Sequence, residues 1–290
     1  MIELYQLEQL VTIAEAGTIS KAAEILLISQ PGLTRSIQRL EEDLGLKLFH
    51  RKKNKVTLND NGLLAVKYAQ KVLNETNNMI LQLQRYDRSK STISIGSCAP
   101  APIWGLSYIF NKLYPEMKVT GDIDAQENVL MEGLKNHQYS IIVLNHPIDD
   151  ENYICIDLFE ECLYLSVPPA HPLAPFKEIS FKDLNGQSIL LLSQIGFWNE
   201  ICLKMIPKSH LLIQEDNNVF YELTKLSALP YFKSNITISR QAEKENRVAI
   251  PIADKEAHVK YYAIFNKDMK KIFAPIKDEI NNIDWNKTNK

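Results

Sequence analysis

Features that would place this chain in several other protein classes are scarce or missing. The four cysteines, Cys98, Cys155, Cys162 and Cys202, form no C-x-x-C pair and no zinc-type spacing with histidine. The longest apolar runs, such as 189–192, are far too short to cross a bilayer, and no basic segment with a following apolar stretch opens the chain. We therefore expect a cytoplasmic protein with reduced thiols, no signal peptide, no metal site and no membrane partner.

Glycine is also scarce, at 10 of 290 residues, and the common catalytic motifs are missing. The sequence has no G-x-S-x-G, no Walker-type loop, no G-x-G-x-x-G and no H-E-x-x-H. Its histidines are scattered, and no convergent set of acid, base and nucleophile can be assembled from them. The sequence therefore predicts a protein that is not an enzyme and that needs no cofactor.

The charge balance excludes a protein that is basic all over, because the formal net charge is only −2. Affinity for nucleic acid would have to come from locally placed cations. In the first 58 residues most of the positive charge lies at Arg35, at Arg39 and between residues 47 and 55. This distribution indicates a basic patch.

Residues 20–45 carry the clearest local pattern, which predicts two helices joined by a tight turn. Ser20 is the expected N-cap of the first helix, and Ser29 is the expected N-cap of the second, with Pro31 tolerated in its first turn. Gly45 stands where a left-handed C-cap is expected. The apolar positions of the second helix fall at steps of four, three and four, which is one buried stripe. They are Leu33, Ile37, Leu40 and Leu44.

The opposite side of the second helix is polar and carries forked donors and amides. Its members are Gln30, Thr34, Arg35, Gln38 and Arg39. A short helix, a tight turn and a second helix with such a face are typical of a helix-turn-helix that reads the major groove. The alternative is an ordinary amphipathic helical hairpin in some other domain.

The string A-A-E-x-L-x-x-S-Q-P-x-L-T-R-x-I-x-x-L-E-x-x-L-G-x-x-L-F, from Ala22 to Phe49, closely resembles the LysR-type transcriptional regulators. The similarity is long and without gaps, and its S-Q-P and L-T-R elements argue against the simple hairpin. The resemblance implies a sequence-specific regulator that binds double-stranded operator DNA, with RNA polymerase as a candidate partner.

The segment after the second helix is expected to form a wing. Residues 48–49 and 56–58 read as two short strands, and the cations between them are suited to phosphates or a minor groove. The alternative is a solvated charged turn. With a supporting helix at 2–16, the sequence predicts a winged helix-turn-helix domain over 1–58, its helix-turn-helix at about 18–37.

Two kinds of DNA contact are expected from this domain, to bases and to phosphates. Side chains near the start of the second helix should meet bases, with Pro31 packed close to the groove: Gln30, Pro31, Thr34, Arg35 and Gln38. The others should mostly hold phosphates: Thr18, Ser20, Arg39, Arg51, Lys52 and Lys53.

Residues 59–90 read as one long linker helix that is mostly polar. Its narrow apolar stripe occupies a and d positions over nearly three heptads and suits pairing with another helix. The stripe is Val66, Ala69, Leu73, Thr76, Ile80 and Leu83. In the resembled family this segment pairs two subunits, which implies a homodimer or homotetramer. The alternative is that the helix folds back on its own chain.

From residue 92 strands and helices alternate, which predicts an α/β unit with a largely parallel sheet. We expect separate strands at 154–159 and 162–167, a strand at 236–239 and a closing helix at 269–283. Two α/β lobes in series resemble the effector-binding half of the same regulators, which is built like a periplasmic binding protein. The expected fold is therefore α+β and multidomain, with an effector domain over 91–290: lobe I at 91–161 and 266–290, lobe II at 162–265.

An effector is expected between the lobes, where strands end and helices begin. Free amides and a hydroxyl at the first strand-to-helix turn would suit a carboxylate. The candidate residues are Ser97, Cys98, Ala99, Pro100, Gln126, Asn145, His146, Ser193, Gln194, Gly196 and Phe197. The alternative for each is a plain surface loop residue. A glycine-rich stretch usual in the family is replaced here at 223–234, which puts the usual pocket shape in doubt.

Two other interpretations stay open. Cys98 near a helix N-terminus could act as a redox switch if Cys202 served as its resolving thiol, without a classical inducer pocket. The chain could also be a ligand-binding protein whose helix-turn-helix makes only dimer contacts. Salt-dependent DNA binding would separate that case from a regulator.

Overall fold

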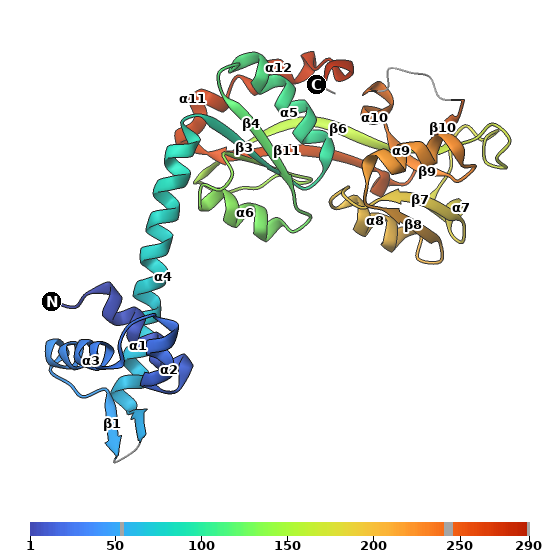
Figure 1. Cartoon of the computed structure of the whole chain (residues 1–290). Coiled ribbons are helices and arrows are strands. Elements are labelled where there is room, and N and C mark those ends of the chain that lie inside the picture. The colour runs from blue at the N-terminus through green and yellow to red at the C-terminus, as the bar shows by residue number, and fades with distance from the viewer. Residues whose placement is uncertain (53–54, 241–245, 289–290) are drawn as a thin grey trace. The chain divides into compact units, whose positions relative to one another are not determined.

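The computed structural model describes residues 1–52, 55–240 and 246–288. The chain divides into two compact units, Met1–Gln84 and Arg85–Lys290. No helix within the described ranges is long and apolar enough to cross a membrane. Figure 1 shows the elements of both units.

The first unit is a winged helix-turn-helix, as the sequence predicts. Helix α1 spans Leu4–Ala16, α2 spans Ile19–Ile25 and α3 spans Gln30–Leu44. Strands β1 (Phe49–Lys52) and β2 (Lys55–Leu58) pair antiparallel and form the wing. The three helices share one apolar core, in which Leu10, Ala22, Leu33 and Leu40 are at most 1% exposed and hold α3 in place.

The caps and the buried stripe of these helices agree with the sequence analysis except for one cap and one stripe residue. Ser29 does cap α3, accepting from the amide of Gly32 at 3.2 Å, and Gly45 ends it in the left-handed conformation. The N-cap of α2 is Thr18, not Ser20, since the Thr18 hydroxyl accepts from the Lys21 amide at 3.3 Å. Leu44 does not complete the buried stripe, because it is 37% exposed.

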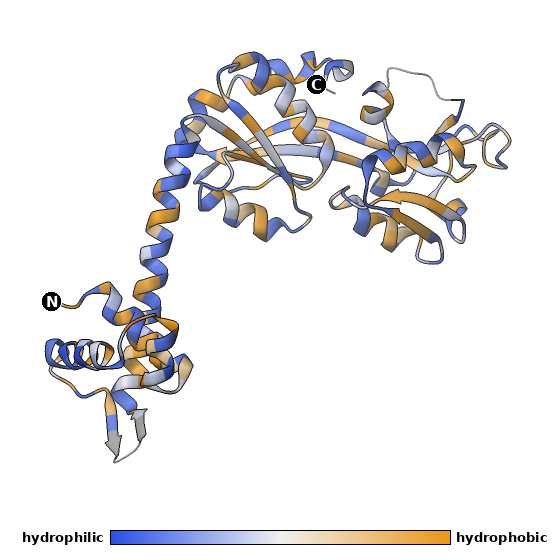
Figure 2. Ribbon diagram, in the orientation of Figure 1, coloured by the Kyte–Doolittle hydropathy of each residue, from blue (hydrophilic) through white to orange (hydrophobic). Residues whose placement is uncertain are grey.

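Helix α4, Asp60–Ser89, is the long linker helix. Asn59 caps it, accepting from the Gly62 amide at 2.8 Å. The N-terminal part of its predicted pairing stripe packs inside the first unit, where Val66, Ala69 and Leu73 join the core. Apolar residues on other faces of α4 stay exposed. Figure 2 shows apolar and polar residues alternating along this helix. Helix α4 therefore has two apolar faces, one packed in the first unit and one exposed. The heptad pattern alone does not distinguish between them.

The first lobe of the second unit is a parallel sheet covered by helices. Strand β3 (Thr92–Ser97) lies between β4 (Lys118–Ile123) and β5 (Ile141–Leu144). Helix α5 (Pro100–Leu113) connects β3 to β4, and α6 (Glu127–Lys135) connects β4 to β5. The four residues of β5 are all buried, as expected for a central parallel strand.

The second lobe repeats this construction. Strand β7 (Ser188–Leu192) pairs in parallel with β8 (His210–Gln214) and with β9 (Tyr231–Ser234). Helix α8 (Trp198–Met205) connects β7 to β8, and α9 (Asn217–Leu226) connects β8 to β9. In both lobes the carboxyl ends of the parallel strands are followed by turns that carry predicted site residues.

Two antiparallel strands join the lobes. Strand β6, Tyr153–Val167, is one continuous strand where the sequence suggested two, and it pairs with β11, His258–Asn266. Figure 1 shows them running side by side through the sheet. Strand β11 also pairs with β5, so the chain returns to the first lobe before the predicted limit at residue 265. The other domain limits remain predictions. Strand β10 (Val248–Pro251) pairs with the second-lobe end of β6.

Two further expectations about local structure are wrong. The predicted strand at 236–239 is part of helix α10, Asn235–Arg240. Its β-branched residues favour a strand, but Ser234 and Thr237 cap each other's amides reciprocally at 3.2 and 2.7 Å and start a helix. The predicted closing helix is divided into α11 (Lys270–Phe273) and α12 (Ile276–Glu279), since Pro275 between them supplies no amide hydrogen.

Candidate DNA-binding face and effector site

The polar side of α3 faces solvent. Gln30, Pro31, Arg35 and Arg39 are exposed, and Thr34 and Gln38 are half-buried. The opposite side of the helix is fixed in the core by Leu33, Ile37 and Leu40, which are at most 2% exposed. The packing therefore presents this polar row as a rigid surface on an ordered helix.

Hydrogen bonds at the start of α3 orient several of these side chains. The Ser20 hydroxyl donates to Gln30 Oε1 at 3.2 Å and so ties α2 to α3. The Thr34 hydroxyl donates to the carbonyl of Gln30 at 2.9 Å, and Arg35 Nε donates to the carbonyl of Pro31 at 3.4 Å. The Arg35 bond uses one of five N–H donors, which leaves the terminal fork for a ligand.

The predicted contacts of the wing are only partly covered by the structure. Arg51 and Lys52 lie in β1, but their side chains are outside the described part of the chain. Lys53 lies outside the described residues. Thr18 and Ser20 are exposed at the start of α2. The roles of all these residues in DNA binding remain predictions.

In the first lobe, the predicted effector residues Ser97, Cys98 and Ala99 come together at the end of β3, but they are buried. The Ser97 hydroxyl donates to the carbonyl of Ala99 at 2.7 Å and accepts from its amide at 3.3 Å. The amide of Cys98 donates to the carbonyl of Val143 at 3.0 Å. The polar groups of this turn are therefore already used within the fold.

The N-terminus of α5 is also poor in donors. Pro100 and Pro102 stand in its first turn and have no amide hydrogen, so among the first three residues only Ala101 can donate. The free amides that motivated a carboxylate effector are therefore largely missing at this turn.

The two lobes meet directly through the turn after β7. The Phe197 amide donates to the carbonyl of Cys98 at 2.9 Å. Gly196 precedes it with φ +64°, and a Cβ placed there would lie 1.9 Å from the same carbonyl oxygen. Glycine is needed both for the left-handed backbone and for this close approach. The predicted residues Gly196 and Phe197 are therefore brought to the predicted residue Cys98.

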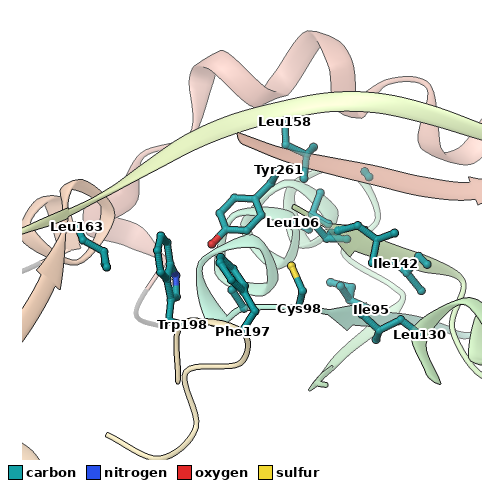
Figure 3. Packing of buried hydrophobic residues seen from close by; sticks show 14 of the residues in the cluster. Ile95, Cys98, Leu106, Leu130, Ile142, Leu158, Leu163, Phe197, Trp198 and Tyr261 are labelled. Atoms are coloured by element: carbon teal, nitrogen blue, oxygen red, sulfur yellow. The ribbon is translucent and has the colours of Figure 1, made fainter. Parts of the chain in front are cut away.

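Aromatic side chains fill the space between the lobes at this contact. Phe197 lies beside Trp198 with ring centroids 4.5 Å apart and beside Tyr261 at 6.3 Å. Figure 3 shows Phe197 between Trp198 and Cys98, with the Tyr261 ring above them. All four residues are at most 6% exposed. Side chains of the protein itself therefore occupy this part of the region predicted to hold an effector.

The most unusual residue here, Glu161, was not among the predicted site residues. Its carboxylate accepts from Tyr261 Oη at 2.5 Å and from Trp198 Nε1 at 3.1 Å, and it is only 5% exposed. Burial raises the pKa of Glu161, while hydrogen bonds from Ser234, Tyr261 and Trp198 oppose that rise. Strand β6 carries three carboxylates, Asp157, Glu160 and Glu161, and nothing in the sequence distinguishes the buried one from the two exposed ones.

The raised pKa of Glu161 predicts a dependence of stability on pH. A carboxyl whose folded-state pKa lies above its ordinary 4.5 stabilises the fold below that value, and this contribution is lost as pH rises through the folded-state pKa. Glu161→Gln keeps an acceptor oxygen and removes the titration. We expect the melting temperature of the wild type to fall relative to that of Glu161→Gln as the pH rises above 4.5. Scanning calorimetry of both proteins over a series of pH values measures this difference, and a difference that stays constant with pH would contradict the prediction.

The remaining predicted effector residues lie at the ends of strands and are mostly exposed. Gln126, Asn145, His146 and Gln194 are exposed, and Ser193 is half-buried. His146 Nε2 lies 3.0 Å from Glu127 Oε2, which joins the turn after β5 to the start of α6. The Ser193 amide donates to the carbonyl of Gln214 at 2.9 Å. The structure thus divides the predicted set into a buried contact between the lobes and separate, mostly exposed residues at strand ends.

The predicted redox pair has the properties of inert thiols. Cys98 and Cys202 are both buried and form no disulfide. Burial raises the pKa of each thiol to about 12, so neither is a thiolate at neutral pH.

Comparison with known proteins identifies the architecture. Residues 4–63 match the family model for bacterial regulatory helix-turn-helix proteins of the lysR family, and residues 95–272 match the LysR substrate binding domain. The chain belongs to the LysR family. It is therefore a DNA-binding transcriptional regulator with an effector-binding domain, and its LysR-type fold, expected from Ala22–Phe49, is confirmed.

Individual LysR relatives are distant but extend along most of the chain. A probable RuBisCO transcriptional regulator of Phaeodactylum tricornutum is 25% identical over 267 residues, 89% of this chain and 83% of that protein. The regulator GltR of Bacillus subtilis is 25% identical and covers 90% and 85%. A hydrogen peroxide-inducible genes activator of Haemophilus influenzae is 29% identical over 66% of this chain and 64% of its own.

Among solved structures, a full-length OxyR variant from Pseudomonas aeruginosa superposes with a TM-score of 0.53 at 19% identity. The alignment covers 97% of this chain and 100% of the other. This likeness concerns the fold alone.

Proposed function

We propose that α3 enters the major groove of a specific operator and that Gln30, Thr34, Arg35 and Gln38 contact bases there. The observation that carries the proposal is the exposed polar row of α3, held rigid by the buried row behind it. Arg39, Thr18, Ser20 and the wing cations supply phosphate contacts, with Pro31 close to the groove. The forked guanidinium of Arg35 suits guanine O6 and N7.

The proposal is tested by fluorescence anisotropy titrations with operator DNA at several salt concentrations. A protein that neutralises phosphates releases counterions, so log K should fall linearly with log salt. Affinity that is independent of salt, or equal for operator and random DNA, would contradict a groove-reading function and favour a helix-turn-helix that serves only dimer contacts.

We further propose that the chain pairs with a second copy through an apolar groove of the first unit. The groove has a volume of about 510 Å³ and lies between α1, the end of α3 and the first half of α4. Leu44, Leu64, Tyr68 and Val72 line it and are 37–58% exposed. Such a contiguous apolar surface is costly in water and suits a helix from another subunit.

Val72→Glu should therefore shift the protein from dimer to monomer. A carboxylate in the groove would have to lose its water on pairing, which strongly disfavours association. Leu63→Glu is the matched control, since Leu63 is 60% exposed on the same helix and does not line the groove. Sedimentation velocity should give a monomer for Val72→Glu and a dimer for Leu63→Glu. A dimer in both variants would show that the groove is not the pairing surface.

The regulator is proposed to respond to a small-molecule effector, with the exposed side chains of Gln126, Asn145, His146 and Gln194 as its polar contacts. The donor-poor start of α5 offers few amides to a carboxylate, so a neutral polar molecule is the better candidate. We also propose that the protein acts in the cytoplasm and controls transcription through RNA polymerase.

A further inference from the structure

Outside the sites described so far, Cys162 and His258 form a thiol–imidazole pair. They face each other across β6 and β11, and His258 Nδ1 lies 3.2 Å from Cys162 Sγ. Cys162 is half-buried and His258 is exposed, so a small molecule can approach the pair. The pair is distinct from Cys98 and Cys202, which are buried.

The tautomer of His258 follows from its second contact. His258 Nε2 lies 3.1 Å from the carbonyl of Ile252, and a carbonyl can only accept, so Nε2 carries a proton. In the neutral ring Nδ1 is then the bare nitrogen and accepts from the Cys162 thiol. The Cys162 thiol therefore has a base, His258, beside it, and the carbonyl of Ile252 orients that base. This is the arrangement of an activated nucleophile.

The backbone of Cys162 is also fixed. Asn235 Oδ1 accepts from the Cys162 amide at 2.9 Å, and Asn235 Nδ2 donates to the carbonyl of Glu160 at 3.1 Å. These bonds hold the sulfur in register with His258. This is the last rung of the β6–β11 ladder, because β11 begins at His258.

The charges around the thiol favour a neutral partner. Burial raises the pKa of Cys162, and the carboxylates of Glu160 and Glu161 add to the rise, so the sulfur needs a base before it can react. Lys260 lies opposite Glu160 but pairs with Asp157 at 2.6 Å. The same carboxylates disfavour anionic reagents. Cys155 lies seven residues along the strand, about 23 Å away, too far to form a disulfide.

We propose that Cys162 is a modification site for small neutral α,β-unsaturated carbonyl compounds, with His258 as its base. The thiol proton passes to His258 Nδ1 as the sulfur forms a bond to the β-carbon and the C=C π bond becomes an enolate. The proton then moves from the imidazolium to the α-carbon, which leaves a thioether and a neutral ring. The addition needs no oxidant and has no leaving group.

An adduct on Cys162 leaves a thioether with no S–H donor, so the hydrogen bond from Cys162 Sγ to His258 Nδ1 is lost. The last rung of the ladder between the lobes is therefore disturbed by modification. Backbone amides at residues 258–260 should exchange with deuterium faster in the adduct than in the free protein, which gives a readout independent of DNA binding.

The test uses N-ethylmaleimide at low excess on the native full-length protein, with each cysteine followed by peptide mass spectrometry. Cys155 is the internal control, since it is half-buried on the same strand and no described histidine lies against it. We expect Cys162 to react about 10-fold faster than Cys155 or more, and His258→Gln to remove most of the difference. His210→Gln, an exposed histidine on β8, should leave it unchanged.

Two results would overturn the proposal. One is equal rates for Cys162 and Cys155 in the native protein, and the other is a Cys162 rate that His258→Gln leaves intact. In urea the two rates should become equal in every variant, which ties any native difference to the folded geometry. Normal amide exchange outside 258–260 in His258→Gln confirms that this variant folds.

Discussion

Replacement of Arg35 by alanine should weaken operator binding by roughly 1–3 kcal/mol, about a 5- to 150-fold rise in Kd. Arg35 is exposed on α3, its Nε is engaged by the carbonyl of Pro31, and its terminal N–H groups remain to pair with a base. Because a base contact carries sequence information, the loss should be largest on the operator and small on random DNA. Gel-shift titrations with both DNAs measure the difference.

Arg39→Ala is the matched control for Arg35. Arg39 is exposed one turn further along the same helix and is expected to hold phosphate. Removal of the Arg39 side chain should weaken binding to operator and to random DNA equally. It should also reduce the slope of log K against log salt by about 1. If Arg35→Ala left operator affinity unchanged, the assignment of α3 as the reading helix would be wrong. If Arg39→Ala weakened binding to the operator only, Arg39 and not Arg35 would be the base contact.

Gly196→Ala should be among the most damaging single-methyl changes in the second unit. The added Cβ would lie 1.9 Å from the carbonyl oxygen of Cys98, so the turn must move and the Phe197–Cys98 hydrogen bond between the lobes must lengthen or break. Left-handed strain and a lost buried hydrogen bond together should cost about 3 kcal/mol or more. Thermal unfolding followed by near-ultraviolet circular dichroism reports the aromatic cluster directly, because Trp198 and Tyr261 pack at this contact.

Gly186→Ala separates backbone strain from the clash. Gly186 also has a positive φ, +97°, but nothing lies within 4 Å of a Cβ placed there. Gly186→Ala should therefore lower the free energy of unfolding only by the backbone strain, about 1 kcal/mol. If Gly196→Ala were no worse than Gly186→Ala, the close approach of the two lobes at Cys98 would not contribute to stability.

The fold of the DNA-binding half could be predicted from the sequence because the residue patterns that determine it are local. Cap residues such as Ser29 and Gly45, and an apolar period such as that of Leu33, Ile37 and Leu40, act within one or two turns of helix. The errors in the same half are one local cap, since Thr18 and not Ser20 caps α2, and the question of what covers each apolar face. Val66 and Leu73 pack within the first unit, and Leu44 lines an exposed groove. A periodic pattern indicates an apolar face but does not say what covers it.

The sequence predicted the architecture of the effector half. It did not predict which residues meet at the contact between the lobes. Alternating strands and helices indicated two lobes, but the contact of Phe197 with Cys98 joins residues about a hundred positions apart. The central role of Glu161 depends on Trp198 and Tyr261, which come from two other elements. Capping by Ser234 and Thr237 turned a β-branched segment into α10, which shows how a local hydrogen bond can outweigh side-chain propensity.

The most direct test of the account is a genome-wide footprint of the wild-type protein beside the Arg35→Ala variant. We expect the wild type to occupy discrete sites made of two related half-sites, spaced for a pair of α3 helices. Arg35→Ala should lose these sites or occupy them with relaxed sequence preference. Identical footprints for the two proteins, or binding without any shared sequence, would contradict the claim that the exposed face of α3 reads DNA.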